Sequence, residues 1–273
     1  MKLILSRKGF DSSAGGMPSP ILPDGRLLPL PIPGRPPAGR GPLRTAGHDL
    51  RELLHGLSRG RIPRDQAYHV DPDLRPGHAG FGQHGAAARH LRHHGVGPGD
   101  LFLFFGWFRE IEAHRGAWRW RPGAADRHVF FGWLSVGERL DLTHPASREA
   151  AQRRLPGHPH LVDAPAYGRL NDLYLPAPHC AVDRAIAGAG QFEYVHPARV
   201  LTRTGCSRSN WSLPAAFAPL PERPGLSYHE DPGRWQRRGN RVHLRAASRG
   251  QEFVLDLCGR PGVRRWLRRL LPA

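Results

Sequence analysis

Two aromatic stretches near the middle of the chain limit its possible folds more than any other feature. Leu101–Phe108 and His128–Val136 are short, apolar and rich in Phe and Trp, which is typical of buried β-strands. They share the order Phe-Phe-Gly-Trp, at 104–107 and at 130–133. We therefore expect two paired core strands, and we favour this explanation over a pocket in which the rings stack on a ligand.

Helical and strand patterns occupy much of the remaining chain. Leucines recur at helical spacing between positions 50 and 57, and Gly82–His94 predicts a second, weaker helix. Further helices are expected at Pro145–Leu155 and in the basic C-terminal segment 260–273, whose apolar residues and arginines lie on opposite faces. Short strands are expected at Lys2–Ser6, Leu170–Leu175, Gln191–Val195, Arg199–Arg203, Arg241–Arg245 and Glu252–Leu257. The sequence thus predicts one α+β domain over 1–273, with a curved, mainly antiparallel sheet flanked by helices.

A proline-rich segment covers residues 17–44. Each proline removes a backbone hydrogen-bond donor, so the segment should be extended rather than helical. Apolar residues such as Ile21 and Leu30 lie among the prolines, which favours an ordered connector packed on the core over a disordered linker.

The chain is strongly basic. Lys and Arg number 40 against 23 Asp and Glu, a formal net charge of +17, which favours a polyanionic partner such as nucleic acid. GC-rich codon usage explains why the basic residues are mostly Arg, but not why basic residues outnumber acidic ones.

The three cysteines are isolated, which excludes a disulfide framework and a four-cysteine zinc site. The N-terminal apolar run is too short for a signal peptide, and the longest apolar stretch falls short of the ~20 residues of a membrane helix. We expect a cytoplasmic protein with no membrane contact.

The loop after the first strand is the first candidate site. Arg7 and Lys8 supply cations, Ser12 and Ser13 supply hydroxyls, and the surrounding glycines leave backbone N–H groups free to bind a phosphate. Asp11 could act as a base or simply fold the loop. The glycine spacing matches neither the dinucleotide fingerprint nor the P-loop, and an ordinary turn is the competing interpretation.

Two further groups could perform acid–base or metal chemistry. Asp71 and Asp73 flank a proline, so their carboxylates could perturb each other's pKa or hold a divalent cation, although turn residues often show this pattern. His158 and His160, with His179 and Cys180, could bind zinc, but their spacing is unlike that of zinc fingers or ribbons. We assign no metal ligands from the sequence, and whether the 158–160 histidines bind a metal is left open.

Polar and aromatic residues near the predicted strands could recognise a base. Asn210 and Gln251 can read a base edge, and Trp107 or Trp211 can stack on a base. Glu252 follows Gln251 and adds a carboxylate. The competing interpretation is that these side chains are buried hydrogen-bonding or packing groups.

Several strings resemble one known family. The opening string is Leu5-Ser6-Arg7-Lys8-Gly9-Phe10-Asp11-Ser12-Ser13, and the others are 18–25, 30–33, 71–74, 82–83, 99–108, 131–134 and 249–254. Together they are similar to the third of the nucleotide modification associated domain families, over the chain from its start to about Leu257.

This resemblance implies a bacterial or phage protein that takes part in modification of bases in nucleic acid, with DNA or a nucleotide and other modification enzymes as partners. It implies no particular reaction or cofactor, and the cofactor stays unknown. It increases the weight on the polar residues in the matching strings. We name as catalytic candidates Asp11, Asp71, Asp73 and Glu252, and as nucleotide- or phosphate-binding candidates Arg7, Lys8, Ser12, Ser13, Asn210, Gln251, Trp107 and Trp211.

A looser resemblance concerns residues 97–142. A Gly-Asp turn followed by two aromatic strands is similar to the PUA-like barrels of the EVE and ASCH groups, which bind modified bases in a pocket. Three hypotheses follow: a DNA base-modifying enzyme or its essential accessory, a non-catalytic reader of a modified base, and a basic scaffold for partner proteins. Fold resemblance alone does not decide among them.

Overall fold

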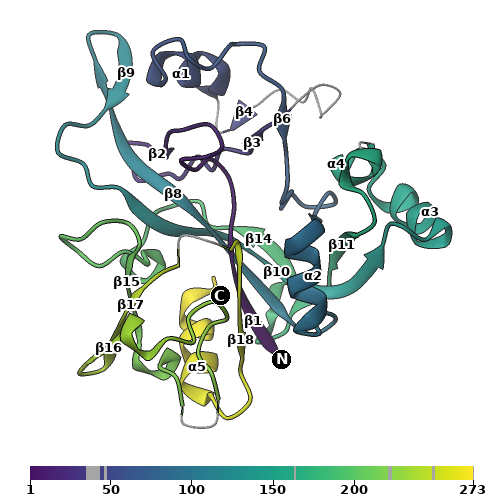
Figure 1. Cartoon of the computed structure of the whole chain (residues 1–273). Helices are drawn as coiled ribbons and strands as arrows, with labels where there is room; N and C mark the ends of the chain where they lie inside the picture. Colours follow the sequence, from purple (N-terminus) through teal and green to yellow (C-terminus); the bar gives the residue numbers. More distant parts are fainter. Residues whose placement is uncertain (35–43, 46–47, 163, 221–222, 248–249, 273) are drawn as a thin grey trace.

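A curled sheet of nine strands is the centre of the computed structural model, which describes residues 1–34, 44–45, 48–162, 164–220, 223–247 and 250–272 (Figure 1). Its main path runs through β18 (Glu252–Asp256), β1 (Lys2–Arg7), β8 (Leu101–His114), β10 (Arg127–Asp141), β11 (Asn171–Pro176) and β7 (Phe81–His84). The other three strands are β2 (Ser19–Ile21) and β9 (Ala117–Trp120), both beside β8, and β14 (Ala189–Gln191), beside β10. Only β1 and β2 run parallel to β8; the other pairings within this sheet are antiparallel. The predicted α+β class and curved, mainly antiparallel sheet are confirmed.

The two aromatic stretches are neighbouring core strands, as predicted. β8 and β10 run antiparallel, with Phe105 opposite Phe130 and Leu103 opposite Trp133. The rings occupy both faces of the sheet: Phe102 and Phe104 contact Phe81 on one face, whereas Phe105 contacts Trp211 and Phe253 on the other. Both strands are longer than predicted, because their ends continue past the core to pair with β9 and β11.

Strand β1 lies between β8 and the edge strand β18, and so brings the N-terminal segment beside a segment near the C-terminus. It pairs in parallel with β8 and antiparallel with β18, and its Leu3, Ile4 and Leu5 are fully buried. Side chains alternate between the faces of an extended strand, so Arg7 and Lys8 leave the end of β1 in opposite directions. Arg7 lies on the face of Phe105 and Phe253, and the Lys8 amine lies 4.7 Å from the centre of the Phe81 ring on the other face.

The helices surround the sheet. They are α1 (Leu50–Leu57), α2 (Gly85–His93), α3 (Pro145–Arg154), α4 (Pro159–Val162) and α5 (Pro261–Leu270), with short 3₁₀ turns at Ala164–Tyr167, Pro197–Arg199, Ala215–Phe217 and Pro232–Arg234. α1, α3 and α5 match the predicted helices. The prediction of a helix over Gly82–His94 was wrong at its start, because residues 82–84 complete β7 by hydrogen bonding to β11. No described helix is long and apolar enough to cross a membrane.

The proline-rich segment is ordered over its described part, residues 17–34. Ile21, Leu22, Leu28 and Leu30 are buried, and β3 (Ile32–Pro33) pairs with β6 (Tyr68–His69). The packed-connector prediction is therefore confirmed there, and residues 35–43 lie outside the described residues.

A three-stranded sheet lies beside α5 in the lower part of Figure 1. It consists of β15 (Asn210–Pro214), β17 (Arg241–Arg245) and β16 (Trp235–Arg238) in that order. Two hairpins complete the description, β12 (His179–Cys180) with β13 (Asp183–Ala187), and β4 (Arg44–Thr45) with β5 (His48–Asp49). The strands predicted at Gln191–Val195 and Arg199–Arg203 were largely wrong: only residue 191 lies in a strand, and Val200 and Thr202 form isolated bridges beside the 3₁₀ turn that begins at Pro197.

Candidate functional site

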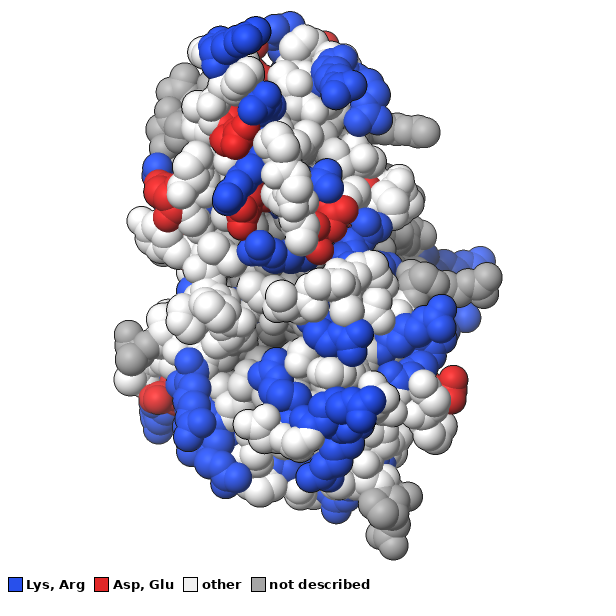
Figure 2. Space-filling model, turned by 90° about the vertical axis from the view of Figure 1, so that its left-hand side faces the viewer, with Lys and Arg blue, Asp and Glu red and all other residues white. Residues whose placement is uncertain are grey.

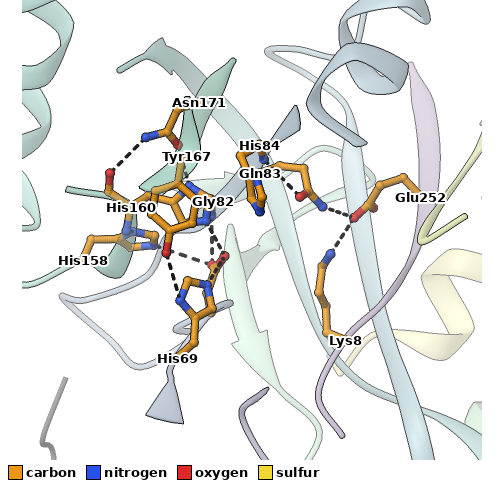
Figure 3. Close-up of polar contacts among 11 residues, drawn as sticks. Lys8, His69, Gly82, Gln83, His84, His158, His160, Tyr167, Asn171 and Glu252 are labelled. Atoms are coloured by element: carbon orange, nitrogen blue, oxygen red, sulfur yellow. Dashed lines mark hydrogen bonds and ion pairs between the residues drawn. The ribbon is translucent and has the colours of Figure 1, made fainter. Parts of the chain in front are cut away.

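Lys8, Gln83 and Glu252 form a buried polar triad on the face of the sheet toward which Lys8 points, here called the Lys8 face (Figure 3). The three residues come from distant segments of the chain. The Lys8 amine donates to Glu252 Oε1 at 2.6 Å, and the Gln83 amide donates to the same oxygen at 2.7 Å. Lys8 and Glu252 are 6% and 1% exposed, so neither charge is solvated by bulk water. Glu252 Oε2 is buried and has no hydrogen-bond partner among the described residues. A buried ion pair of this kind depends on both charges being present.

A cluster of imidazoles surrounds a second buried carboxylate next to the triad. Asp71 Oδ2 lies 3.4 Å from His160 Nε2 and 3.6 Å from His69 Nε2, and its Oδ1 lies 3.6 Å from His158 Nε2. The Gly82 backbone N–H donates to Asp71 Oδ1 at 2.9 Å. Burial would raise the pKa of Asp71, but the three imidazoles outweigh it and hold the pKa well below its ordinary value. Asp71 is therefore a buried carboxylate anion.

The ring of His160 is held on all sides. Its Nδ1 hydrogen-bonds to Asn171 Oδ1 at 2.5 Å, and the Asn171 amide donates to the His160 carbonyl at 3.0 Å. Tyr167 stacks on it at 4.1 Å between ring centres. A Cβ atom at Gly82 would lie 2.3 Å from the imidazole, so only glycine fits there.

His84 connects the two groups. It lies at the end of β7, directly after Gln83, and its ring centre lies 5.9 Å from that of His160. Burial lowers the pKa of His84, and His160, His69 and Lys8 lower it further through their charges. The triad and the imidazole cluster thus share one electrostatic environment. Among the described residues, His69, Asp71 and His160 could hold a metal ion, because their ligand atoms all lie within 4.8 Å of one another.

A pocket of about 580 Å³ opens on the other face, beside Arg7. Its walls combine cations and aromatic rings: Arg7, Arg208, Phe105, His128, Trp211 and Phe253. The Arg208 guanidinium lies 4.1 Å from the centre of the Trp107 ring and donates to Ser12 Oγ at 3.3 Å. Burial lowers the pKa of Arg7, and Arg208 adds to this effect whereas Asp11 opposes it. A pocket with two partly buried guanidinium groups is electrostatically suited to an anion.

The opening loop forms one rim of this pocket. Ser12 lines it, and Asp11 Oδ1 accepts hydrogen bonds from the Ser13 N–H, the Ser13 hydroxyl and the Ala14 N–H at 2.7, 2.7 and 2.8 Å. Burial raises the pKa of Asp11, but these hydrogen bonds outweigh it, so the pKa lies below its ordinary value. Asp11 is therefore an ionised group that folds the loop.

The remaining candidates are dispersed. Asp73 accepts from Arg75 near the surface, and the Asn210 amide donates to Ser207 Oγ at 2.8 Å. Gln251 is exposed, and its backbone carbonyl accepts from the Arg7 N–H. Trp211 is buried and donates from Nε1 to His128 Nδ1 at 3.0 Å.

The structure thus divides the sequence candidates between two places. Arg7, Ser12 and Trp211 line one pocket, with Trp107 behind Arg208. Lys8, Glu252 and Asp71 lie on the opposite face. The two cations that were expected to share a phosphate therefore point into different sites.

Sequence reasoning missed several residues of both places. His69, Gln83, His84 and Asn171 complete the buried groups, and His128 and Arg208 complete the pocket. The proximity of His158 and His160 in the sequence was the available signal, but His69 and Asp71 come from a strand and a loop far earlier in the chain.

The chain was compared with models of protein families. The family model described as nucleotide modification associated domain 3 matches residues 2–256. The chain belongs to this family. The match includes β1, β7, β18 and the loops that carry both candidate places, and the family is associated with nucleotide modification. A search of curated proteins found no match, and neither did a search of solved structures.

The Lys8–Glu252 pair predicts a coupled stability effect. Glu252→Leu leaves a buried ammonium without its partner, so the free energy of unfolding should fall by about 3–5 kcal/mol. The double variant Lys8→Met/Glu252→Leu removes both charges and should recover most of that loss in urea unfolding. Glu149→Ala, which removes the exposed pair with Arg153, is the control and should cost under about 1 kcal/mol. Additive losses in the double variant would contradict the coupling.

His128 predicts acid sensitivity. Burial, with Arg7 and Arg208 nearby, lowers the pKa of His128 to about 3, below its ordinary value. The unfolded chain therefore binds more protons as pH falls below about 6.5, and His128 should cost about 3 kcal/mol of stability between pH 7 and pH 4. Between pH 7 and pH 4, His128→Asn should lose about 3 kcal/mol less unfolding free energy than the wild type, whereas the exposed His114→Asn should lose as much as the wild type. Equal slopes in all three proteins would refute this assignment.

Proposed function

We propose that this protein modifies bases of DNA, and that the Arg7 pocket receives the nucleotide. The observation that carries the proposal is the pairing of Arg7 and Arg208 with aromatic walls in one pocket, in a chain of a nucleotide-modification family. Guanidinium groups bind phosphate, and aromatic rings stack on bases. The volume of about 580 Å³ falls within the range of about 300–1,000 Å³ that is typical of small-molecule sites.

The pocket continues into a basic groove. A second hollow of about 570 Å³ shares Gly205 and Cys206 with it and is lined by Arg127, Arg203 and Arg241. A third hollow shares Arg203 and reaches Arg245 on β17. This continuity supports a path for the phosphates that flank a nucleotide in the pocket.

The surface charge agrees with this path. In Figure 2 a constriction separates an upper part, where acidic and basic side chains mix, from a lower part where Lys and Arg predominate. The exposed Arg238, Arg241 and Arg245 point to the same face of the β15–β17–β16 sheet, because Arg238 lies opposite Arg241 and side chains alternate along a strand. No described carboxylate lies within ion-pair distance of them. We call these three side chains the arginine face and propose that it holds the DNA backbone.

A non-catalytic reader is the second candidate. The state of Asp11 favours it: this carboxylate, which acts electrostatically on Arg7, already accepts three hydrogen bonds from its own loop. In a reader, Asp11 would shape the pocket and perform no proton transfer. In an enzyme, its second oxygen would be the acid–base group.

The arginine face predicts the salt dependence of DNA binding. Replacing Arg238, Arg241 and Arg245 by Gln should weaken binding to duplex or single-stranded oligonucleotides at low salt. It should also reduce the slope of log affinity against log salt by about 0.7–0.9 for each phosphate that the variant no longer neutralises.

The control for this variant removes the same charge elsewhere. Arg148, Arg153 and Arg154 on α3 are exposed, so their replacement by Gln should leave the slope unchanged if location matters. Equal losses of affinity in both triple variants would mean that DNA is attracted by the net charge of the protein and is not held at the arginine face. Weak affinity with no salt dependence would instead favour the protein scaffold.

The substitution Asp11→Asn distinguishes a base-modifying enzyme from a non-catalytic reader. Asn retains Oδ1 as the acceptor for Ser13 and Ala14, so the loop should keep its shape while the charge is lost. If the protein is the enzyme, modified nucleosides should disappear from the DNA of cells carrying Asp11→Asn, while the purified variant keeps its oligonucleotide affinity within about twofold. Nucleoside mass spectrometry measures the first quantity, and Asp24→Asn, an exposed carboxylate on a neighbouring turn, is the matched control. Unchanged modification would remove Asp11 from the mechanism.

A further inference from the structure

The geometry points to a site for one divalent transition-metal ion, held by His69 Nε2, His160 Nε2 and Asp71 Oδ2. This inference concerns the Lys8 face of the sheet and does not rest on the proposed function of the Arg7 pocket. The three ligand atoms come from the end of β6, from the loop that follows it and from α4, and they converge within 4.8 Å of one another (Figure 3).

The distances fit a bound ion better than direct hydrogen bonds. Asp71 Oδ2 lies 3.4 Å from His160 Nε2 and 3.6 Å from His69 Nε2. N–H···O hydrogen bonds usually measure about 2.7–3.2 Å, so these contacts are too long. Ligands about 2.1 Å from a tetrahedral metal lie about 3.4 Å from each other, which matches the two separations between Asp71 Oδ2 and the imidazoles.

The outer hydrogen bonds leave the ligand atoms available. Asn171 Oδ1 can only accept, so it takes the proton of His160 Nδ1 and leaves Nε2 as the ring nitrogen that faces Asp71 and is available to an ion. The Tyr167 hydroxyl can accept from His69 Nδ1 at 3.3 Å in the same manner. A partner of this kind on the distal ring nitrogen is usual for metal-binding histidines.

The two oxygens of Asp71 have different roles. Oδ1 accepts from the Gly82 N–H at 2.9 Å and faces His158 Nε2 at 3.6 Å, whereas Oδ2 faces only the two ligand histidines among the contacts described for this group. His158 Nδ1 accepts from the His160 N–H, so its proton lies on Nε2 and points at Oδ1. At 3.6 Å the His158 N–H makes no hydrogen bond, so the Gly82 N–H is the group that fixes Oδ1, and Oδ2 is left for the ion.

The donor set defines the class of ion. Two imidazoles and one carboxylate suit Zn²⁺ or Fe²⁺, whereas Mg²⁺ and Ca²⁺ prefer oxygen ligands alone. Three protein ligands also leave coordination positions open for water or a substrate atom, as in catalytic rather than structural sites. Access is available from outside, because the His69 side chain is 18% exposed.

Metal content and metal titration of the full, untagged chain test the site. After expression in metal-supplemented medium, elemental analysis should find close to one equivalent of Zn or Fe per chain. After removal of metal by a chelator, calorimetric titration with Zn²⁺, and with Fe²⁺ without oxygen, should show one tight site for at least one ion, and Mg²⁺ should bind at least 100-fold more weakly.

Variants locate the ion. His69→Gln, at the partly exposed ligand, should lose at least 100-fold in affinity while keeping its circular dichroism spectrum. Asn171→Ala should lose 10–100-fold, and Asn171→Asp, which still accepts from His160 Nδ1, should restore binding. His94→Gln is the control, because His90 and His94 form another close pair, on α2 and just past its end, and it should leave affinity unchanged. No retained metal with no tight titration, or tight binding that survives His69→Gln, would overturn the inference.

Discussion

The buried ion pair between Lys8 and Glu252 is the interaction on which both candidate places depend. It connects residues 244 positions apart in the chain, and Gln83 joins it from a third segment. The pair fixes the end of β1 against the start of β18, and therefore determines where the opening loop leaves the sheet. Through Gln83 it also fixes the end of β7, where Gly82 and His84 approach His160. A buried charge pair is costly to break, so the two sites are held in a fixed relation to the same strand.

Strand alternation then divides the chemistry between two faces. Arg7 and Lys8 are consecutive, yet Arg7 lies in an open pocket with Arg208, and Lys8 lies in a closed, neutralised triad. The Arg7 pocket has an excess of positive charge and aromatic walls, which suits an anion with a planar group. The Lys8 face has a buried carboxylate surrounded by imidazoles, which suits a cation. The end of one extended strand therefore contributes to two sites, of which the Arg7 pocket suits an anion and the Lys8 face suits a cation.

The net charge of +17 also divides into parts. On α3, Arg153 pairs with Glu149 and Arg154 with Glu138, so much of their field is cancelled locally. The β9 hairpin behaves similarly, with Arg119 and Arg121 paired to Glu112 and Glu110. The arginine face has no such described partners, and it adjoins the groove that leads to the Arg7 pocket. The position of this uncompensated charge is therefore more informative than the sum.

Residue patterns along the chain were sufficient to predict the aromatic core strands, the α1, α3 and α5 helices, the packed proline-rich connector and the family. Each of these depends on local periodicity, turn chemistry or a long contiguous string. The same patterns singled out Arg7, Lys8, Asp71 and Glu252, but not how these residues group. The folded chain was needed to show that Lys8 pairs with Glu252 and Gln83, that His69, Asp71 and His160 converge, and that residues 82–84 are strand rather than helix. These contacts join segments far apart in the chain, and their existence depends on sheet order and register, which local residue patterns do not encode.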